Sequence, residues 1–200
     1  MAPMLCAPLS PRTVHLCIDM QRIFSADGLW PAPWMARVLP VVSELAGRFP
    51  ERTIFTRFIT PVHAEDMPGM WRRYYKKWQQ ATREHLDLHW LGLVDPLNTF
   101  VPPAAVVDKA RYSAFAGSKL RALLEERGAD GLIVTGSETD VCVLSTVLDA
   151  VDFGYRVIIV QDGVCSSSDA GHDASLEVYR KRYSVQIESA KAEEILRQWK

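Results

Sequence analysis

The sequence predicts a three-layer α/β/α sandwich built on a mainly parallel sheet of about six strands. Short apolar and β-branched runs alternate along the chain with amphipathic helical patterns. Several runs are apolar on consecutive residues, such as Leu-Ile-Val at 132–134 and Val-Ile-Ile-Val at 157–160. Such runs are typical of strands covered on both faces, as in a parallel sheet. The alternating order implies right-handed crossovers that place helices on both faces.

Six runs are predicted as strands because they are short and rich in apolar or β-branched residues. They cover residues 13–18, 52–58, 105–108, 131–135, 156–160 and 184–187. Four helices are predicted from apolar residues spaced three and four apart. Their stripes are Leu120, Leu123 and Leu124; Leu144, Val147, Leu148 and Val151; Leu176, Tyr179 and Tyr183; and Ala192, Ile195, Leu196 and Trp199. Ser118, Gly128 and Gly154 stand where helix caps are expected.

The 200 residues are interpreted as one domain, 1–200, with an aromatic-rich insertion at about 61–103. The insertion has no clear strand, but it contains a helical pattern with one aromatic face, formed by Trp71, Tyr74, Tyr75 and Trp78. Three interpretations of this face are open. It is buried against the domain or another subunit, it forms a lid over a pocket, or it binds a nucleic acid or a membrane surface.

Composition argues against several classes of function. Lys and Arg number 23 and Asp and Glu 24, so the net charge of −1 does not favour a nucleic-acid partner. No apolar run approaches the roughly 18 residues of a membrane span, and no secretory signal is evident. The four cysteines are scattered without CxxC spacing, which favours reduced thiols in a cytoplasmic protein: Cys6, Cys17, Cys142 and Cys165.

Chemically active side chains end several of the predicted strands. Ligands of open parallel sheets bind outside the carboxyl ends of the strands. Asp19 ends the first strand, Asp108 and Lys109 end the third, and Asp162 ends the fifth. Cys142 falls near the start of the helix that follows the fourth strand. We therefore expect an acid, a base and a thiol at one edge of the sheet.

These side chains suit nucleophilic catalysis. The first turn of a helix favours a thiolate at Cys142, and a nearby Lys109 would lower the pKa of the thiol further. Asp19 would then move the proton between the thiol and a leaving group. The plainer alternatives are that Cys142 is a small core residue and that Asp19 and Lys109 form a structural ion pair.

Four motifs in order resemble the isochorismatase-like cysteine hydrolases, which include nicotinamidases and N-carbamoylsarcosine amidases. They are IDMQRIF, DKARYSAF, TGSETDVCV and YRVIIVQDGVCSSSDAGHDASLEVY, and the resemblance runs from about residue 14 to 187. It implies a catalytic triad of Asp19, Lys109 and Cys142. It also implies a cis peptide at Ser137–Glu138 and an oxyanion hole formed by the backbone N–H groups of Glu138 and Cys142.

The resemblance implies a cysteine hydrolase that cleaves the C–N bond of a small amide or ureido compound through a thioester and releases ammonia or an amine. No cofactor is expected. The resemblance also implies a homo-oligomer, either a dimer or a tetramer. Two alternatives stay open. One is an isochorismatase-type hydrolase of a vinyl ether, and the other is a non-catalytic oligomeric scaffold with the same fold.

Residues beside the motifs are candidates for substrate binding: Phe24, Arg111, Ser113, Phe115 and Ser137. Core packing, a surface position or a loop hydrogen bond would explain some of them equally well. The Glu138 side chain either points away or selects a cationic substrate.

No metal site is predicted. Metal-binding nicotinamidases carry an Asp-x-His at the end of the second strand, where this chain has Thr56 and Phe58. His85 and His89 are spaced to share one face of a helix, but no third ligand is evident beside them.

Overall fold

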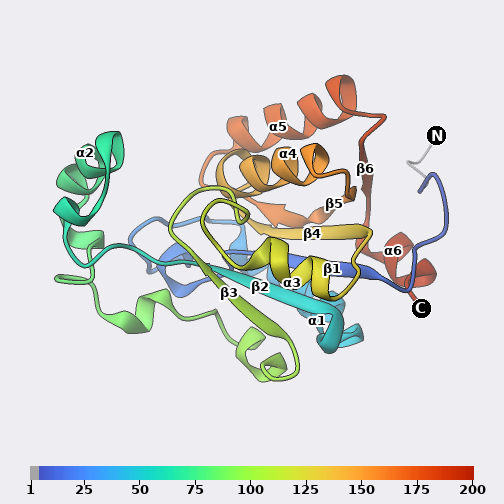
Figure 1. Ribbon diagram of the computed structural model, residues 1–200, viewed down its shortest axis with the longest axis horizontal. Helices are drawn as coiled ribbons and strands as arrows, with labels where there is room; N and C mark the ends of the chain where they lie inside the picture. Colours follow the sequence, from blue (N-terminus) through green and yellow to red (C-terminus); the bar gives the residue numbers. More distant parts are fainter. Residues whose placement is uncertain (1–4) are drawn as a thin grey trace.

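A computed structural model describes residues 5–200 and contains a six-stranded sheet in which every neighbouring pair is parallel. The strand order is β3-β2-β1-β4-β5-β6 (Figure 1). The strands are β1 Thr13–Ile18, β2 Thr53–Phe58, β3 Ala105–Lys109, β4 Gly131–Ser137, β5 Arg156–Cys165 and β6 Ile187–Ala190. The predicted α/β class and parallel sheet are confirmed.

Helices cover both faces of the sheet (Figure 1). Helices α3, Leu120–Glu126, α4, Leu144–Asp152, and α5, Asp169–Arg182, bury their apolar stripes on one face. Helices α1, Met35–Arg48, and α6, Ala192–Gln198, cover the other. The four predicted helical stripes lie on α3, α4, α5 and α6 or at their ends. Helix α1 was not predicted because Pro40 interrupts its pattern, but this proline lies on the exposed side of the helix.

Two strands, β5 and β6, differ from the prediction by three residues or more at a boundary. The last strand begins at Ile187 rather than 184, because the chain turns after α5 and leaves Val185 94% exposed. Strand β5 continues past 160 to Cys165 through a register shift against β4. Asp162 therefore does not end a strand, and its Oδ1 accepts a hydrogen bond from Ala192 N–H at the start of α6. The expectation that Asp162 belongs to the site edge is wrong.

The insertion is irregular except for helix α2, Gly69–Lys77, and several short 3-10 turns, and it projects from the left of the sheet in Figure 1. The aromatic face of α2 packs against the domain. Tyr75 is fully buried, and Trp71, Tyr74 and Trp78 are partly buried against the core. No helix among residues 5–200 has the length and apolar character of a membrane span.

Candidate active site

Asp19 stands at the carboxyl end of β1 and is completely buried. Its backbone is left-handed, with φ at 47°, a conformation that is uncommon outside glycine and that Asp tolerates better than most residues. Thr56 from β2 fixes one carboxylate oxygen. The Thr56 hydroxyl donates to Asp19 Oδ1 at 2.6 Å and accepts from Asp19 N–H at 3.1 Å. Sequence reasoning noted Thr56 only as the replacement of a metal ligand and missed this positioning role.

Lys109 ends β3, and its ammonium is bound by three oxygen atoms, one from Asp19 and two from backbone carbonyls. Lys109 Nζ lies 2.6 Å from Asp19 Oδ2, in an ion pair whose two side chains are fully buried. It donates to the backbone carbonyls of Arg111, at 2.9 Å, and Tyr112, at 3.0 Å. Burial opposes the charge of Lys109, but the charges of Asp19 and Cys142 outweigh it and raise the pKa. Lys109 is therefore a fixed ammonium.

Cys142 lies in a π-helical turn, Thr139–Val143, that leads directly into α4. Such turns are frequent at functional sites. Burial raises the pKa of the thiol, the negative charge of Asp19 raises it further, and Lys109 only partly opposes both. This shift is opposite in direction to the one expected from the helix start and from Lys109. Its causes are the loss of water around the buried sulfur and the carboxylate of Asp19, which opposes the effect of the Lys109 ammonium.

The turn before Cys142 has the backbone that the resemblance implies. The Ser137–Glu138 peptide is cis. The Glu138 carbonyl accepts the N–H groups of Val141, at 3.1 Å, and Val143, at 3.0 Å. Gly136 permits the close approach of β4 to β1, because a Cβ there would lie 2.0 Å from Ile18 O. This approach brings the turn beside Asp19.

Two of the predicted substrate-binding residues adjoin members of the triad through the backbone: Ser137 directly precedes the cis peptide, and the Arg111 carbonyl accepts a hydrogen bond from Lys109. The buried Ser137 hydroxyl lies beside the Cys165 thiol and lowers the pKa of that thiol, against the larger effect of burial. Arg111 is half-buried, donates to the Ala110 carbonyl, and places its guanidinium 5.5 Å from the centre of the Trp71 ring. Its charge is close enough to lower the pKa of Tyr75, against the larger effect of burial.

The other three candidates make packing contacts. Phe24 is buried and stacks on Trp30, with ring centres 6.0 Å apart. The Ser113 hydroxyl donates to the Asp149 carboxylate and accepts from Phe115 N–H. The Phe115 ring packs against Phe153, at 5.1 Å, and Tyr155, at 6.0 Å. Ser113 and Phe115 therefore hold the loop after β3 against α4 and against the turn that follows α4.

Three tyrosines around Cys142 were not identified as site residues by sequence reasoning. Burial raises the pKa of Tyr74, Tyr75 and Tyr112, and a negative charge on Cys142 would raise each of them further. Tyr74 and Tyr75 come from α2, so this helix forms part of the wall of the site. Trp71 lies between Tyr112 and Tyr74, because its ring centre is 4.8 Å from that of Tyr112 and 5.7 Å from that of Tyr74.

The histidines of the insertion do not gather into a metal site. His85 lies in a turn and His89 in a 3-10 turn, Leu88–Leu91, so the helical spacing assumed for them is not realised. His63 Nδ1 lies 3.1 Å from a Glu84 oxygen. Residues 5–200 contain no group of three or more His, Cys, Asp or Glu side chains arranged to hold a metal ion.

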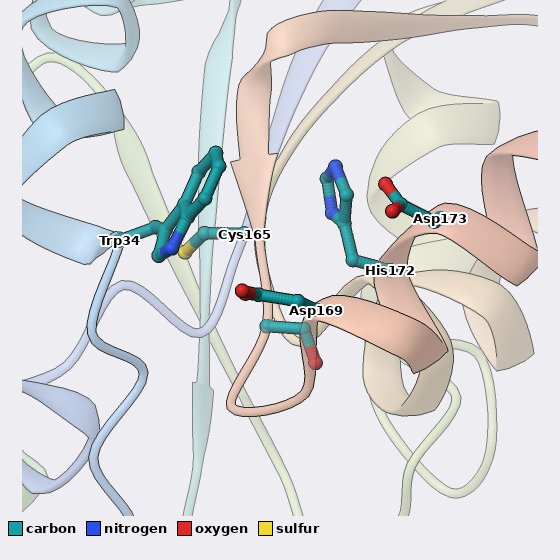
Figure 2. Close-up of a pocket in the computed structure, with 6 residues that line it drawn as sticks. Trp34, Cys165, Asp169, His172 and Asp173 are labelled. Carbon is teal, nitrogen blue, oxygen red and sulfur yellow. The ribbon is translucent and has the colours of Figure 1, made fainter.

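A separate pocket of about 90 Å³ lies between the start of α1 and the start of α5 (Figure 2). It is lined by Trp34, Cys165, Ser166, Asp169, His172 and Asp173. No member of the predicted triad lines it, although it backs onto the π-helical turn, since His172 Nδ1 lies 2.8 Å from Thr139 Oγ1. This hydrogen bond gives His172 a structural role, and we do not place the reaction in this pocket.

Comparison with known proteins assigns the chain to a family. The isochorismatase domain model matches residues 13–191, and the chain belongs to the isochorismatase family of hydrolases. An isochorismatase family protein of Bacillus subtilis is 36% identical over 86 residues, which are 43% of this chain and 47% of that protein. An N-carbamoylsarcosine amidase of an Arthrobacter species is 29% identical over 166 residues, 77% of this chain and 59% of its own length.

The structural comparison covers more of the chain. A cysteine hydrolase of Pseudomonas syringae pv. phaseolicola superposes with a TM-score of 0.83 at 25% identity. The match covers 98% of this chain and 97% of that one. The fold is therefore shared over nearly the whole length, whereas the two relatives above match over only about half of their own length.

Proposed function

We propose that this protein is a cysteine hydrolase that cleaves the C–N bond of a small amide or ureido compound, with Cys142 as nucleophile. The observation that carries the proposal is the convergence of Asp19, Lys109 and Cys142 from β1, β3 and the turn after β4. The similarity to an N-carbamoylsarcosine amidase supports the same class of bond.

The first half of the reaction forms a thioester. Cys142 Sγ attacks the carbonyl carbon while its proton passes to the neighbouring carboxylate of Asp19. The carbonyl oxygen takes up the electron pair and is stabilised by the backbone N–H groups of Glu138 and Cys142. The intermediate collapses, the C–N bond breaks, and the leaving nitrogen takes the proton from Asp19.

The second half of the reaction hydrolyses the thioester and frees Cys142. Asp19 accepts a proton from water, the hydroxide adds to the thioester carbon, and the C–S bond breaks. The departing sulfur recovers the proton from Asp19, so the neutral thiol of the resting site is restored. Throughout, Lys109 offsets the negative charge that moves between Asp19 and Cys142, because its ammonium is fixed by two backbone carbonyls.

Assay of released ammonia tests the proposal on a panel of nicotinamide, N-carbamoyl amino acids, biuret and acyclic ureides. We expect at least one of these to release ammonia with wild-type protein and none to do so with Cys142→Ala. Consumption of isochorismate without ammonia release would contradict the proposal in favour of a vinyl-ether hydrolase. Inertness toward every compound, with Cys142 no more reactive toward iodoacetamide than the other cysteines, would favour a scaffold.

A further inference from the structure

The loop between β3 and α3, residues 110–119, carries the two backbone carbonyls that bind the Lys109 ammonium. These carbonyls belong to Arg111, at 2.9 Å, and Tyr112, at 3.0 Å. Two residues further along the loop, the Ala114 N–H donates to the hydroxyl of Thr146 on α4 at 2.9 Å. The position of the ammonium therefore depends on where α4 holds this loop.

The same hydroxyl also binds the residue that carries the nucleophile. Thr146 Oγ1 donates to the Cys142 carbonyl at 2.7 Å. A hydroxyl has one donor and two acceptor positions, so a single oxygen can make both bonds at once. Because Thr146 is fully buried, solvent does not replace either bond. One oxygen atom thus joins the turn of Cys142 to the loop that binds Lys109.

The neighbouring residue on α4 shows which of these two bonds is ordinary. Ser145 Oγ donates to the Val141 carbonyl at 2.8 Å, which is the local bond that Ser and Thr often make to the carbonyl four residues earlier in a helix. The half-buried Ser145 makes no hydrogen bond to the loop among residues 5–200. Thr146 adds to the local bond a second one, to a residue 32 positions earlier. This second bond indicates a role beyond the helix.

The separation of ammonium and sulfur matters to the chemistry. Lys109 lowers the pKa of Cys142, against the larger effects of burial and of Asp19. The energy of two charges depends inversely on their separation, and the dependence is strongest where water is excluded. Asp149 also holds the loop, through the Ser113 hydroxyl, but this bond does not reach Cys142. The hydroxyl of Thr146 is therefore placed to keep this separation short.

We propose that Thr146 is a positioning residue for the reaction, whose hydroxyl fixes the loop that binds Lys109 against the turn that carries Cys142. The inference rests on the proposed function. The Thr146 hydroxyl binds only backbone groups, so it acts through the ammonium and the sulfur and is not itself a catalytic residue. Loss of this hydroxyl should lower kcat and leave KM nearly unchanged.

Three variants of α4 test this role on the amide of the ammonia panel that wild-type protein hydrolyses. Thr146→Val removes the hydroxyl at nearly constant volume, and kcat should fall about tenfold with KM within about twofold of wild type. Thr146→Ser keeps both bonds and should restore kcat to within about threefold of wild type. Ser145→Ala is the matched control, because it removes only the local bond to Val141, and kcat should not change.

Alkylation of Cys142 gives a second readout, which does not depend on turnover. With iodoacetamide the sulfur forms a C–S bond, iodide leaves, and the thiol proton passes to the buffer. Peptide mass mapping gives the rate at Cys142 apart from the exposed Cys6, at a temperature where every variant is folded. Thr146→Val should react about tenfold more slowly than wild type, because the ammonium stabilises the thiolate less well. A turn that is only loosened would expose the sulfur and react faster.

Three results would each overturn the inference alone. They are equal kcat values for Thr146→Val and Ser145→Ala, equal losses in the valine and serine variants of Thr146, and an alkylation rate in Thr146→Val that matches or exceeds that of wild type. Failure of the proposed function is recognised separately, by a Cys142→Ala variant that keeps full turnover. The inference then falls with it, because no thiolate takes part in the reaction.

Discussion

His15 in β1 and Asp19 directly after this strand are both fully buried polar side chains, and their surroundings differ. Both ring nitrogens of His15 have partners: Nε2 lies 2.8 Å from Thr135 Oγ1, and Nδ1 lies 3.4 Å from Thr53 Oγ1. Burial lowers the pKa of His15 to about 3, so the ring is neutral at pH 7. Both ring nitrogens of His15 are therefore satisfied within the fold, without a ligand.

Asp19, four residues further along, is a buried carboxylate with an ammonium 2.6 Å from one of its oxygens, that of Lys109. The comparison teaches how to separate two kinds of buried polar group. A neutral group with all its hydrogen bonds made contributes to folding and specifies the register of the sheet. A charged group placed beside a second charge at the carboxyl edge of the sheet is suited to a reaction. The predictions below test this distinction.

Removal of the nucleophile should have the largest effect. Cys142→Ala should lower kcat by at least about 10⁴-fold, because the thioester route is closed, and should leave the thermal midpoint within a few degrees of wild type. Cys165→Ala is the matched control, since it removes another buried thiol near the same turn. Steady-state ammonia release and thermal denaturation measure both variants. Equal losses in the two would contradict the role given to Cys142.

The next largest effect should follow from changing the proton carrier. Asp19→Asn keeps the hydrogen bond to Thr56 but cannot accept the thiol proton, so kcat should fall about 10³-fold. The lost charge also leaves Lys109 buried without its partner, which should destabilise the fold by roughly 3–5 kcal/mol. Urea denaturation and turnover at a temperature where the variant remains folded separate the two effects. A folded Asp19→Asn with unchanged kcat would contradict this account.

His15 should affect stability through pH and leave the chemical step alone. Its pKa is lowered in the fold, so its contribution is complete above the unfolded pKa of about 6.5 and is lost as pH falls toward about 3. Between pH 7 and pH 4 this loss amounts to on the order of 3 kcal/mol.

His15→Gln should flatten the dependence of the unfolding free energy on pH over that range. The measurement is urea denaturation at several pH values for wild type and variant. If the unfolding free energies of the two proteins changed with pH in parallel, folding would not shift the pKa of His15 and the prediction would be contradicted.

The smallest effect should come from the residue that orients Asp19. Thr56→Val removes the hydroxyl at nearly constant volume, and we expect kcat to fall about tenfold, while Thr56→Ser should restore most of the activity. Rescue by serine separates orientation of Asp19 from packing in β2. Similar losses in the valine and serine variants would assign Thr56 to packing instead.

The sequence permits prediction of the fold and of the edge where the triad meets, because these depend on local patterns. Apolar runs place Asp19 and Lys109 at the carboxyl ends of β1 and β3, two parallel strands with β2 between them. The helical stripe from Leu144 places Cys142 just before α4. The direction in which the fold shifts the pKa of Cys142 was not foreseen, since it depends on burial and on a balance of two charges that only the folded chain defines.

The wall of the site was predicted only in part for a similar reason. The aromatic stripe of α2 was visible in the sequence, but its approach to Cys142 depends on the path of a long irregular insertion. The roles of Thr56 and Thr146 depend on which hydrogen bonds their hydroxyls make. No spacing along the chain encodes that information.

Trapping of the covalent intermediate tests the central claim most directly. A substrate from the ammonia panel is mixed with wild-type protein, the reaction is quenched in acid within one turnover, and the chain is mapped by mass spectrometry. The account predicts an acyl group in thioester linkage on Cys142 that forms and disappears at rates consistent with kcat. Turnover at full rate with no acyl group on Cys142 at any time, or with the group on a different residue, would contradict it.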